Sequence, residues 1–421
     1  MLRAVFSISA LLLAAAILLA GNGLQGTLLA VRGNLEGFPT ALIGALMSAY
    51  YTGFILGCRF NPSFIKSVGH IRTFLALASI ASAATLMHPF FVNVIAWAVL
   101  RAITGFCFAG LIMIIESWIN ERATNANRGQ ILSVYRVIDL GATTAGNMLL
   151  ATASPQGFEL FALTSILISL ALVPVALTRG DAPKPIATAR LNIPKLFQVS
   201  PVAAIGAPLI GLGNAAFWSV GAVYAARLGY DKALIASFMS SVIIGAAVLQ
   251  WPLGWISDRI DRRLVMIGSA ICGVSAAIAL ARYGGVSPHL LLLLGATFGA
   301  FIIPMFGLTA AHANDHAEPG TAVETNGGLL LLNGCGSVIG ATLGAIVMAK
   351  FGPAALFEYI AAVYSIFIVF CIIRVLITKP VPEAEKSPFS PVPKNAAPTV
   401  FEIGADDESR SETEDGAPNA A

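Results

Sequence analysis

Residues 100–120 read LRAITGFCFAGLIMIIESWIN, and residues 129–139 read GQILSVYRVID. Each stretch belongs to an apolar run long enough to cross a bilayer. Together they nevertheless carry four ionisable side chains: Arg101, Glu116, Arg136 and Asp139. Placing one such side chain deep in a membrane span costs about 2.5–3.5 kcal/mol on insertion scales. We therefore expect all four to face protein or a water-filled cavity rather than lipid, and that cavity is where function should be sought.

The composition of the whole chain is that of a polytopic membrane protein. Of its 421 residues, 57% are hydrophobic and 11% are charged, and the mean hydropathy is +0.81. A soluble protein could not hide so much apolar surface in one core, because most of its surface must face water. The net charge of +3 comes with basic residues in short loops. It therefore indicates membrane topology, and we expect no nucleic-acid partner.

Known signatures of catalytic and metal chemistry are missing from the sequence. It contains no phosphate-binding glycine loop, zinc pattern or nucleophile elbow, so we expect no enzyme and no cofactor or metal. His312 and His316 flank Asp315, which would suit a metal, but the polar stretch that follows favours a solvated loop. The cysteines form no Cys-x-x-Cys pair, and we interpret them as small apolar side chains: Cys58, Cys107, Cys272, Cys335 and Cys371.

The apolar runs predict twelve membrane spans. A window of about 20 residues places them at 4–31, 40–60, 71–90, 92–120, 129–152, 157–179, 200–227, 233–256, 264–283, 288–312, 322–349 and 354–378. The first run resembles a signal peptide but is too long for one, so we expect an uncleaved span. Gly336, Gly340 and Gly344 recur every four residues in the eleventh, which favours close helix packing.

Basic residues divide unevenly between the two sides that these spans create. With the amino terminus inside, the cytoplasmic side would hold Arg3, Arg59, Lys66, Arg72, Arg122, Arg128, Arg179, Lys184, Arg190, Lys195, Arg259, Arg262, Arg263, Arg374 and Lys379. The outer side would hold Arg32, Arg227, Lys232, Arg282 and Lys350. The positive-inside rule therefore predicts a multi-pass protein of the inner (plasma) membrane with both termini in the cytoplasm.

Polar segments divide the chain into parts. Residues 180–199 are polar and contain prolines, and we expect a cytoplasmic linker between the six-span bundles 1–179 and 200–378. Residues 379–421 are rich in Pro, Ala, Ser, Asp and Glu. Such a stretch has too little apolar area to offset its ordering entropy, so we expect a disordered cytoplasmic tail.

The two bundles repeat each other in sequence. A shift of 192 residues aligns Gly21-Asn22 with Gly213-Asn214, Met47-Ser48 with Met239-Ser240, and Gly53 with Gly245. Parallel repeats of six spans are typical of one large class of secondary transporters, in which the substrate site lies between the halves near the midplane.

The same shift aligns two loops. Residues 254–263 read GWISDRIDRR, and their first-half counterpart, residues 62–70, reads PSFIKSVGH. The first resembles the Gly-x-x-x-Asp-Arg-x-Gly-Arg-Arg signature of the major facilitator superfamily, with Gly254, Asp258, Arg259, Arg262 and Arg263 in the matching places. It departs from the signature only at Asp261. The counterpart keeps the second glycine as Gly69 but has Lys66 in place of the acid, which weakens or replaces the contact expected there.

Other stretches resemble one branch of that superfamily. ESWIN at 116–120, NRG at 127–129 and LQWPLG at 249–254 look most like the YcaD-like bacterial transporters, and Arg101 followed by Gly105 resembles a fourth-helix motif whose arginine is associated with proton coupling. The resemblance covers residues 4–378. It implies an all-α integral membrane fold of twelve helices in two pseudo-symmetric six-helix bundles, and secondary transport by alternating access.

The charged candidates each have two interpretations. Arg101 lies roughly 15 Å from the outer end of its span, where it could bind an anionic group or bias a neighbouring acid, or could cap carbonyls of another helix. Asp139 could exchange a proton or form a permanent pair with Arg136. Glu116 lies near the inner end of its span, and we expect a gating or structural pair with Arg128 or Arg136.

Polar side chains in both halves are candidates for lining a cavity. Asn22 and Asn214 occupy equivalent places, with Gln25 and Trp218 one turn beyond them, and they could line a cavity or tie helices together. Asn333 is a weaker candidate, and Tyr50, Tyr51 and Gln250 are weaker again.

These observations predict a monomeric secondary transporter in contact with membrane lipid. We expect a small-molecule substrate and H⁺ coupling, with efflux as one open direction of transport. The alternative is a transport-inactive, transporter-like membrane sensor or scaffold, supported by the altered first-half loop.

Overall fold

The computed structural model describes residues 9–122, 128–177, 192–318, 321–382, 386, 389 and 392. Within these ranges the chain is helical and contains no strand. The helices of the first half are α2 (Ser9–Leu35), α3 (Thr40–Val68), α4 (His70–Met87), α5 (Val94–Arg122), α6 (Arg128–Leu149) with the short η1 (Leu150–Thr152), α7 (Glu159–Leu170) and α8 (Leu172–Ala176). After α9 (Ile193–Val199) come α10 (Pro201–Arg227), α11 (Lys232–Arg259), α12 (Arg262–Tyr283), α13 (Pro288–Ile302), α14 (Met305–Asn314), α15 (Ala322–Phe351) and α16 (Ala355–Ile377).

Membrane-length helices account for the predicted spans. Eleven segments among the described residues are long and apolar enough to cross a bilayer, with α7 and α8 forming one segment and α13 and α14 another. The twelfth span is α6, which is less apolar because it carries Arg136, Asp139 and Asn147. The predicted all-α architecture of twelve membrane helices is therefore confirmed.

Helix α3 extends beyond the second predicted span, which ends at residue 60. Helix α3 continues through Pro62 to Val68, because Asn61 and Ile65 are buried against neighbouring helices on either side of the proline. It ends at Gly69, whose φ of +94° is a conformation that L side chains rarely adopt. The two signature-like segments are therefore mostly the last turns of α3 and α11, and little loop remains between these helices and the next.

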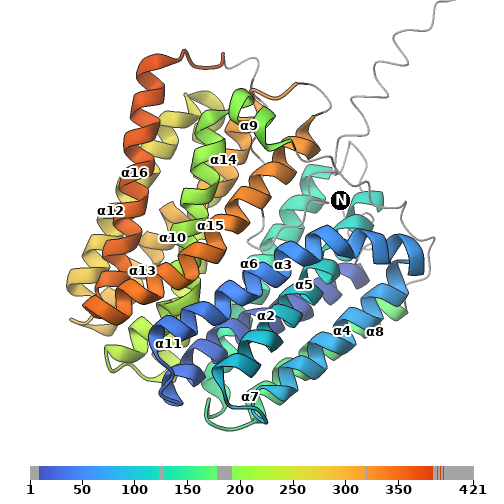
Figure 1. Cartoon of the computed structure of the whole chain (residues 1–421). Helices are drawn as coiled ribbons and strands as arrows, with labels where there is room; N and C mark the ends of the chain where they lie inside the picture. The colour runs from blue at the N-terminus through green and yellow to red at the C-terminus, as the bar shows by residue number, and fades with distance from the viewer. Residues whose placement is uncertain are drawn as a thin grey trace, which may run out of the picture.

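The helices form two bundles side by side. Figure 1 shows α2–α8, in blue to teal, beside α10–α16, in green to red. Matching helices make matching contacts: α3 packs on α5 as α11 packs on α13, and α2 packs on α6 as α10 packs on α15. Across the two halves, α3 contacts α15 and α6 contacts α11. The predicted linker lies largely outside the described residues, which include α9 at its end.

Close backbone contacts repeat with the same geometry in the two halves. A Cβ atom built on Gly53 would lie 2.0 Å from the Ala102 carbonyl oxygen, and one built on Gly245 would lie 1.9 Å from that of Ala296. A Cβ atom built on Gly340 would lie 2.3 Å from the carbonyl oxygen of Leu212. Only glycine permits such an approach of two helices. The glycine stripe in α15 is thus a packing surface against α10, as predicted.

We call the two ends of the molecule the Arg227 end, where α10 ends and α11 begins, and the Arg262 end, where α11 ends and α12 begins. The Arg262 end is at the top of Figure 1. Hydrogen bonds between the halves gather toward the Arg227 end: Arg227 donates to Thr40, and Lys232 Nζ donates to the Ala153 carbonyl over 2.8 Å. Ser48 Oγ donates to the Val338 carbonyl over 2.5 Å.

Candidate functional site

Arg101 is buried without a carboxylate partner among the described residues. Its side chain, on α5, is 1% exposed. Its Nη1 donates to Gln25 Oε1 over 3.3 Å, its Nη2 donates to Met47 Sδ over 3.0 Å, and its Cζ lies 4.3 Å from the centre of the Tyr50 ring. Its Nε has no hydrogen-bond partner in the described part of the chain. A cation held by one amide, one thioether and one aromatic face keeps much of its capacity to attract an anion.

A polar cluster surrounds this guanidinium in the first half. Gln25 Nε2 donates to Thr85 Oγ1 over 2.9 Å, which joins α2 to α4, and the Tyr50 hydroxyl donates to Asn22 Oδ1 over 3.5 Å. Asn22 is half-buried, whereas Gln25 and Tyr50 are buried. The structure thus brings together three predicted site residues, Arg101, Gln25 and Asn22. Met47 was missed, and only its position one turn before the weaker candidate Tyr50 could have indicated it.

Arg136 and Asp139 form a buried ion pair on one face of α6. Arg136 Nη1 donates to Asp139 Oδ2, and each side chain is 6% exposed. Arg136 Nε also donates to Gln250 Oε1 of α11 over 3.2 Å. Gln250 was only a weak candidate in the sequence, yet it connects this pair to the second half. A charged pair within α6 therefore takes part directly in the contact between the two bundles.

Glu116 lies apart from these charges. It is completely buried on α5 and forms a side-chain hydrogen bond with Tyr135 of α6. The side chain of Arg128, one of the partners expected for Glu116, lies outside the described residues. The other expected partner, Arg136, is engaged with Asp139 and Gln250.

The second-half candidates make contacts between helices. Asn214 Oδ1 accepts from the Tyr364 hydroxyl over 2.9 Å, which joins α10 to α16. Asn333 Nδ2 donates to the Ala207 carbonyl over 3.0 Å, which joins α15 to α10. Trp218 is half-buried, with its ring 5.1 Å from that of Phe217 in an edge-on arrangement. All three side chains retain some exposure.

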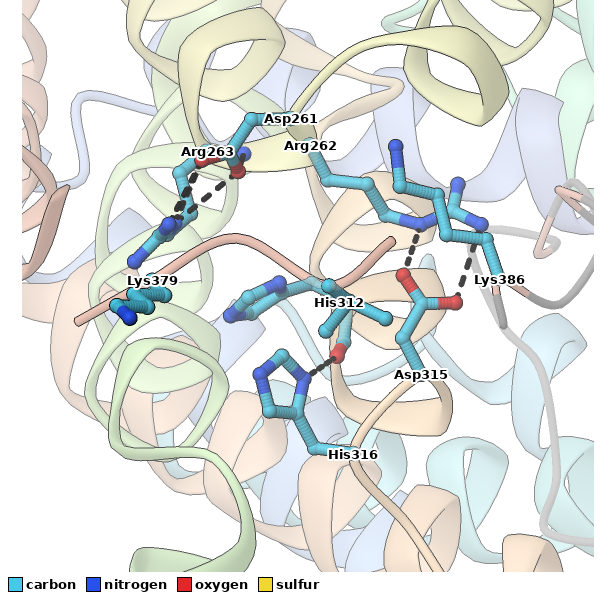
Figure 2. A pocket seen from close by; sticks show the side chains of 9 residues that line it. Asp261, Arg262, Arg263, His312, Asp315, His316, Lys379 and Lys386 are labelled. Atoms are coloured by element: carbon cyan, nitrogen blue, oxygen red, sulfur yellow. Dashed lines mark hydrogen bonds and ion pairs between the residues drawn. The ribbon is translucent and has the colours of Figure 1, made fainter. Parts of the chain in front are cut away.

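The signature-like residues of the second half form a charged network at the Arg262 end, and Figure 2 shows the part of it around Arg262 and Arg263. Arg262 is 1% exposed. Its Nε donates to Asp315 Oδ2 over 2.6 Å and its Nη2 to Asp315 Oδ1 over 3.2 Å, while its Nη1 donates to Asp258 Oδ1 over 2.9 Å. One guanidinium therefore joins the end of α11, the start of α12 and the end of α14.

Arg263 holds the carboxyl end of α16. Its Nη1 donates to the carbonyl oxygens of Arg374 and Thr378 over 3.1 and 3.0 Å, and its Nη2 donates to Asp261 Oδ2 over 2.7 Å. Burial tends to raise the pKa of Asp261, but the hydrogen bonds and charge of Arg263 outweigh it, so this pKa lies below its ordinary value. The contact therefore stabilises the fold above the ordinary carboxyl pKa, and this contribution is lost as the pH falls through the lowered one.

The first-half counterpart differs in its contacts. Lys66 is exposed and forms no ion pair among the described residues, and Gly69 serves the turn between α3 and α4. In the second half, the Cζ of Arg259 lies 3.8 Å from the centre of the Trp255 ring. The asymmetry expected from the sequence thus corresponds to different surroundings in the structure.

The solvated loop expected around His312, Asp315 and His316 was wrong. The side chain of Asp315 is only 1% exposed, and both of its oxygens accept from Arg262. His312 is 6% exposed, and His316 Nδ1 donates to the His312 carbonyl over 2.9 Å. No group of metal-binding side chains is found in the described ranges. The ion pair could not be predicted from the sequence, because Asp315 lies 53 positions from Arg262.

Comparisons with known proteins agree with this architecture. The sequence model of the Major Facilitator Superfamily matches residues 11–323 and 203–406 in two overlapping segments. The "Uncharacterized MFS-type transporter YcaD" of Salmonella newport is 25% identical over 333 residues, covering 78% of this chain and 86% of the relative. Its counterpart in Escherichia fergusonii is 23% identical over 335 residues, covering 79% and 86%.

Solved structures share the fold at low sequence identity. A mutant of the nucleoside transporter NupG has a TM-score of 0.75 at 14% identity, covering 88% of this chain and 99% of that one. A bacterial homologue of the human lysosomal transporter Spinster, in an inward-facing and unoccupied conformation, has a TM-score of 0.68 at 14% identity, covering 99% of each chain. A D-xylose–proton symporter has a TM-score of 0.65 at 15% identity, covering 91% and 99%.

Proposed function

Because the chain belongs to the Major Facilitator Superfamily, we propose that it is a proton-coupled secondary transporter that moves a small molecule across the inner membrane by alternating access. The observation that carries this proposal is the buried chain of contacts from Asp139 through Arg136 to Gln250. It places an ionisable pair at the surface between the two bundles, where a change of protonation can alter how the bundles meet.

The coupling step follows from the chemistry of the pair. Protonation of Asp139 removes the negative charge that Arg136 faces, and the buried guanidinium is then left with the neutral acid and Gln250. An unbalanced buried charge is unfavourable, so Arg136 would seek other partners or water. Its contact with α11 would change as a result, and proton uptake would shift the balance between two arrangements of the halves.

The distribution of contacts along the molecule supports an inward-facing arrangement. The halves are joined by hydrogen bonds at Thr40 and Arg227 and at Ala153 and Lys232. These positions form the end that the distribution of Lys and Arg predicts to be outside. The similar fold of a bacterial Spinster homologue described as inward-facing fits the same arrangement.

The polar cluster around Arg101 is our candidate for substrate contact. The solved relatives are named for nucleosides in one case and for D-xylose in another, so the shared fold selects no substrate. In this chain the cluster holds a buried guanidinium without a described carboxylate, beside Gln25 and Asn22. Such a site suits a substrate with an anionic or hydrogen-bond-accepting group.

Two experiments in sequence test the proposed transport. A thermal-shift screen of metabolites and drugs on the purified protein identifies ligands, and counterflow of a radiolabelled hit in proteoliposomes then measures exchange across the membrane. We expect the labelled compound to be taken up against its own concentration gradient during counterflow. Ligand binding without counterflow would instead support the sensor or scaffold alternative, for which the exposed Lys66 in the altered segment at the end of α3 is the main observation.

A further inference from the structure

A phenylalanine far beyond the last helix is seated against α11 and α14. The ring of Phe389 packs against a glycine on each of these two helices. A Cβ atom built on Gly254 would be 2.2 Å from Phe389 Cδ1, and one built on Gly307 would be 3.3 Å from Phe389 Cε2. The backbone N–H of Phe389 donates to Asp258, over 3.0 Å to Oδ1 and 3.3 Å to Oδ2. Ring and backbone are therefore both held by residues of the second half.

Two further tail residues make contacts at the same end. Lys386 Nζ donates to the Ile260 carbonyl over 2.6 Å, and Lys386 lines the pocket shown in Figure 2 together with Arg262 and Asp315. Val392 packs against two apolar clusters. One is built mainly from the first half and includes Ile115, Trp118 and Ile119; the other, from α9 and the second half, includes Leu196, Ala310 and Leu329. The tail thus reaches from the second half to the first.

These tail contacts lie where they can affect how the two halves move. Gln250, which bonds to Arg136 across the halves, lies nine residues before the end of α11. Toward the Arg262 end from there, Phe389 and Val392 occupy space beside α11, α14 and the first-half cluster. If the halves are to approach each other at this end, as alternating access requires, the apolar side chains between them must leave.

We propose that Lys386, Phe389 and Val392 form an autoinhibitory tail wedge, which docks Phe389 into the notch made by Gly254 and Gly307 and holds the Arg262 end open. This inference rests on the proposed alternating access. The role of Asp258 is then double: it pairs with Arg262 and accepts from the backbone of the wedge. The absence of a Cβ at position 254 is what makes room for the ring.

The test measures the separation of the halves directly and needs no substrate. Spin labels are placed on Lys66→Cys and Arg259→Cys, two exposed positions of α3 and α11 at the Arg262 end. The labels are attached in a full-length chain whose five native cysteines are replaced. We expect a single long distance in the parent protein. Phe389→Ala should add a shorter distance and raise the ratio of closed to open molecules about tenfold, or roughly 1.4 kcal/mol, since truncating a well-packed aromatic anchor commonly costs more than 1 kcal/mol.

Two further variants make the test specific. Gly254→Ala leaves the tail intact but fills the notch, and it should produce the same short distance. Phe401→Ala, in the same tail but outside the described residues, should match the parent. Unchanged distances in Phe389→Ala, or an equal shift in Phe401→Ala, would overturn the wedge even if counterflow is normal. A failure of counterflow would instead count against the proposed transport and leave these distances to judge the wedge.

Discussion

Arg262 grips Asp315 with two hydrogen bonds, of 2.6 and 3.2 Å, and thereby ties the start of α12 to the end of α14. Both side chains are 1% exposed. Removal of one partner from a buried pair leaves the other as an uncompensated charge, which typically costs about 3–5 kcal/mol.

We therefore expect Asp315→Ala to lower the thermal unfolding midpoint of the detergent-purified protein strongly. The double change Asp315→Ala with Arg262→Met should recover part of the loss, because no buried charge is then left unpaired. Lys195→Ala is the matched control: it removes the exposed ion pair with Glu318 and should leave the midpoint unchanged. If Asp315→Ala melts like the parent, the network is not a structural element.

Replacement of Asp139 should abolish the accumulation of substrate but leave substrate exchange partly intact. Asp139→Asn keeps the shape of the side chain but cannot lose a proton, so accumulation driven by a proton gradient should be abolished while exchange without a gradient persists in part. Transport assays in proteoliposomes, with and without an imposed pH difference, measure both rates. Should the variant still concentrate substrate as the parent does, Asp139 is only a structural partner of Arg136, and the proton site must be sought at Glu116.

The two signature-like segments should respond unequally to the loss of charge. Asp258→Asn removes an ion pair with Arg262, so it should disturb the balance between the two orientations of the halves and reduce transport. Lys66→Gln changes an exposed side chain without a described ion pair and should be tolerated. The initial rates of uptake by the two variants decide the point, and equal losses would count against the asymmetry.

Close helix contacts should make the glycine at position 245 irreplaceable. A Cβ added there would meet the carbonyl oxygen of Ala296 at 1.9 Å, so Gly245→Ala must push α11 away from α13 and lower the unfolding midpoint. Gly268→Ala is the control, because a Cβ at this helical position meets nothing within 4 Å and alanine favours a helix by about 1 kcal/mol over glycine. Equal melting of the two variants would contradict the packing argument.

The orientation in the membrane can be tested at two positions outside the described residues. The positive-inside rule predicts that the linker and the tail are cytoplasmic. Single cysteines in place of Thr188 or Ser409, in a background lacking the native cysteines, should resist an impermeant thiol reagent in intact cells and react after the cells are opened. Ready labelling of intact cells at either position would reverse the assignment.

The sequence predicted what depends on local composition and on the repeat. The spans, the close packing of the α15 glycines and the family could all be predicted from the sequence, because apolar length and glycine spacing act within one helix. Contacts between residues distant in the chain could not be predicted. Asp315 bonds to Arg262, Gln250 bonds to Arg136 and Phe389 packs on Gly254, and nothing in the stretches around these residues indicates their partners. The continuation of α3 past Pro62 was not predicted either, because the burial around this proline is a tertiary effect.

The paired glycine contacts also determine where this molecule can bend. Gly53 meets Ala102 and Gly245 meets Ala296 backbone to backbone, so sliding of either helix pair would bring side chains into the place of these glycines. Each bundle should accordingly rock as a rigid body. The freedom of movement is then left to the surface where α6 meets α11, which is crossed by the side-chain hydrogen bond of Arg136 to Gln250. Such a bond can break and re-form within a single transport cycle.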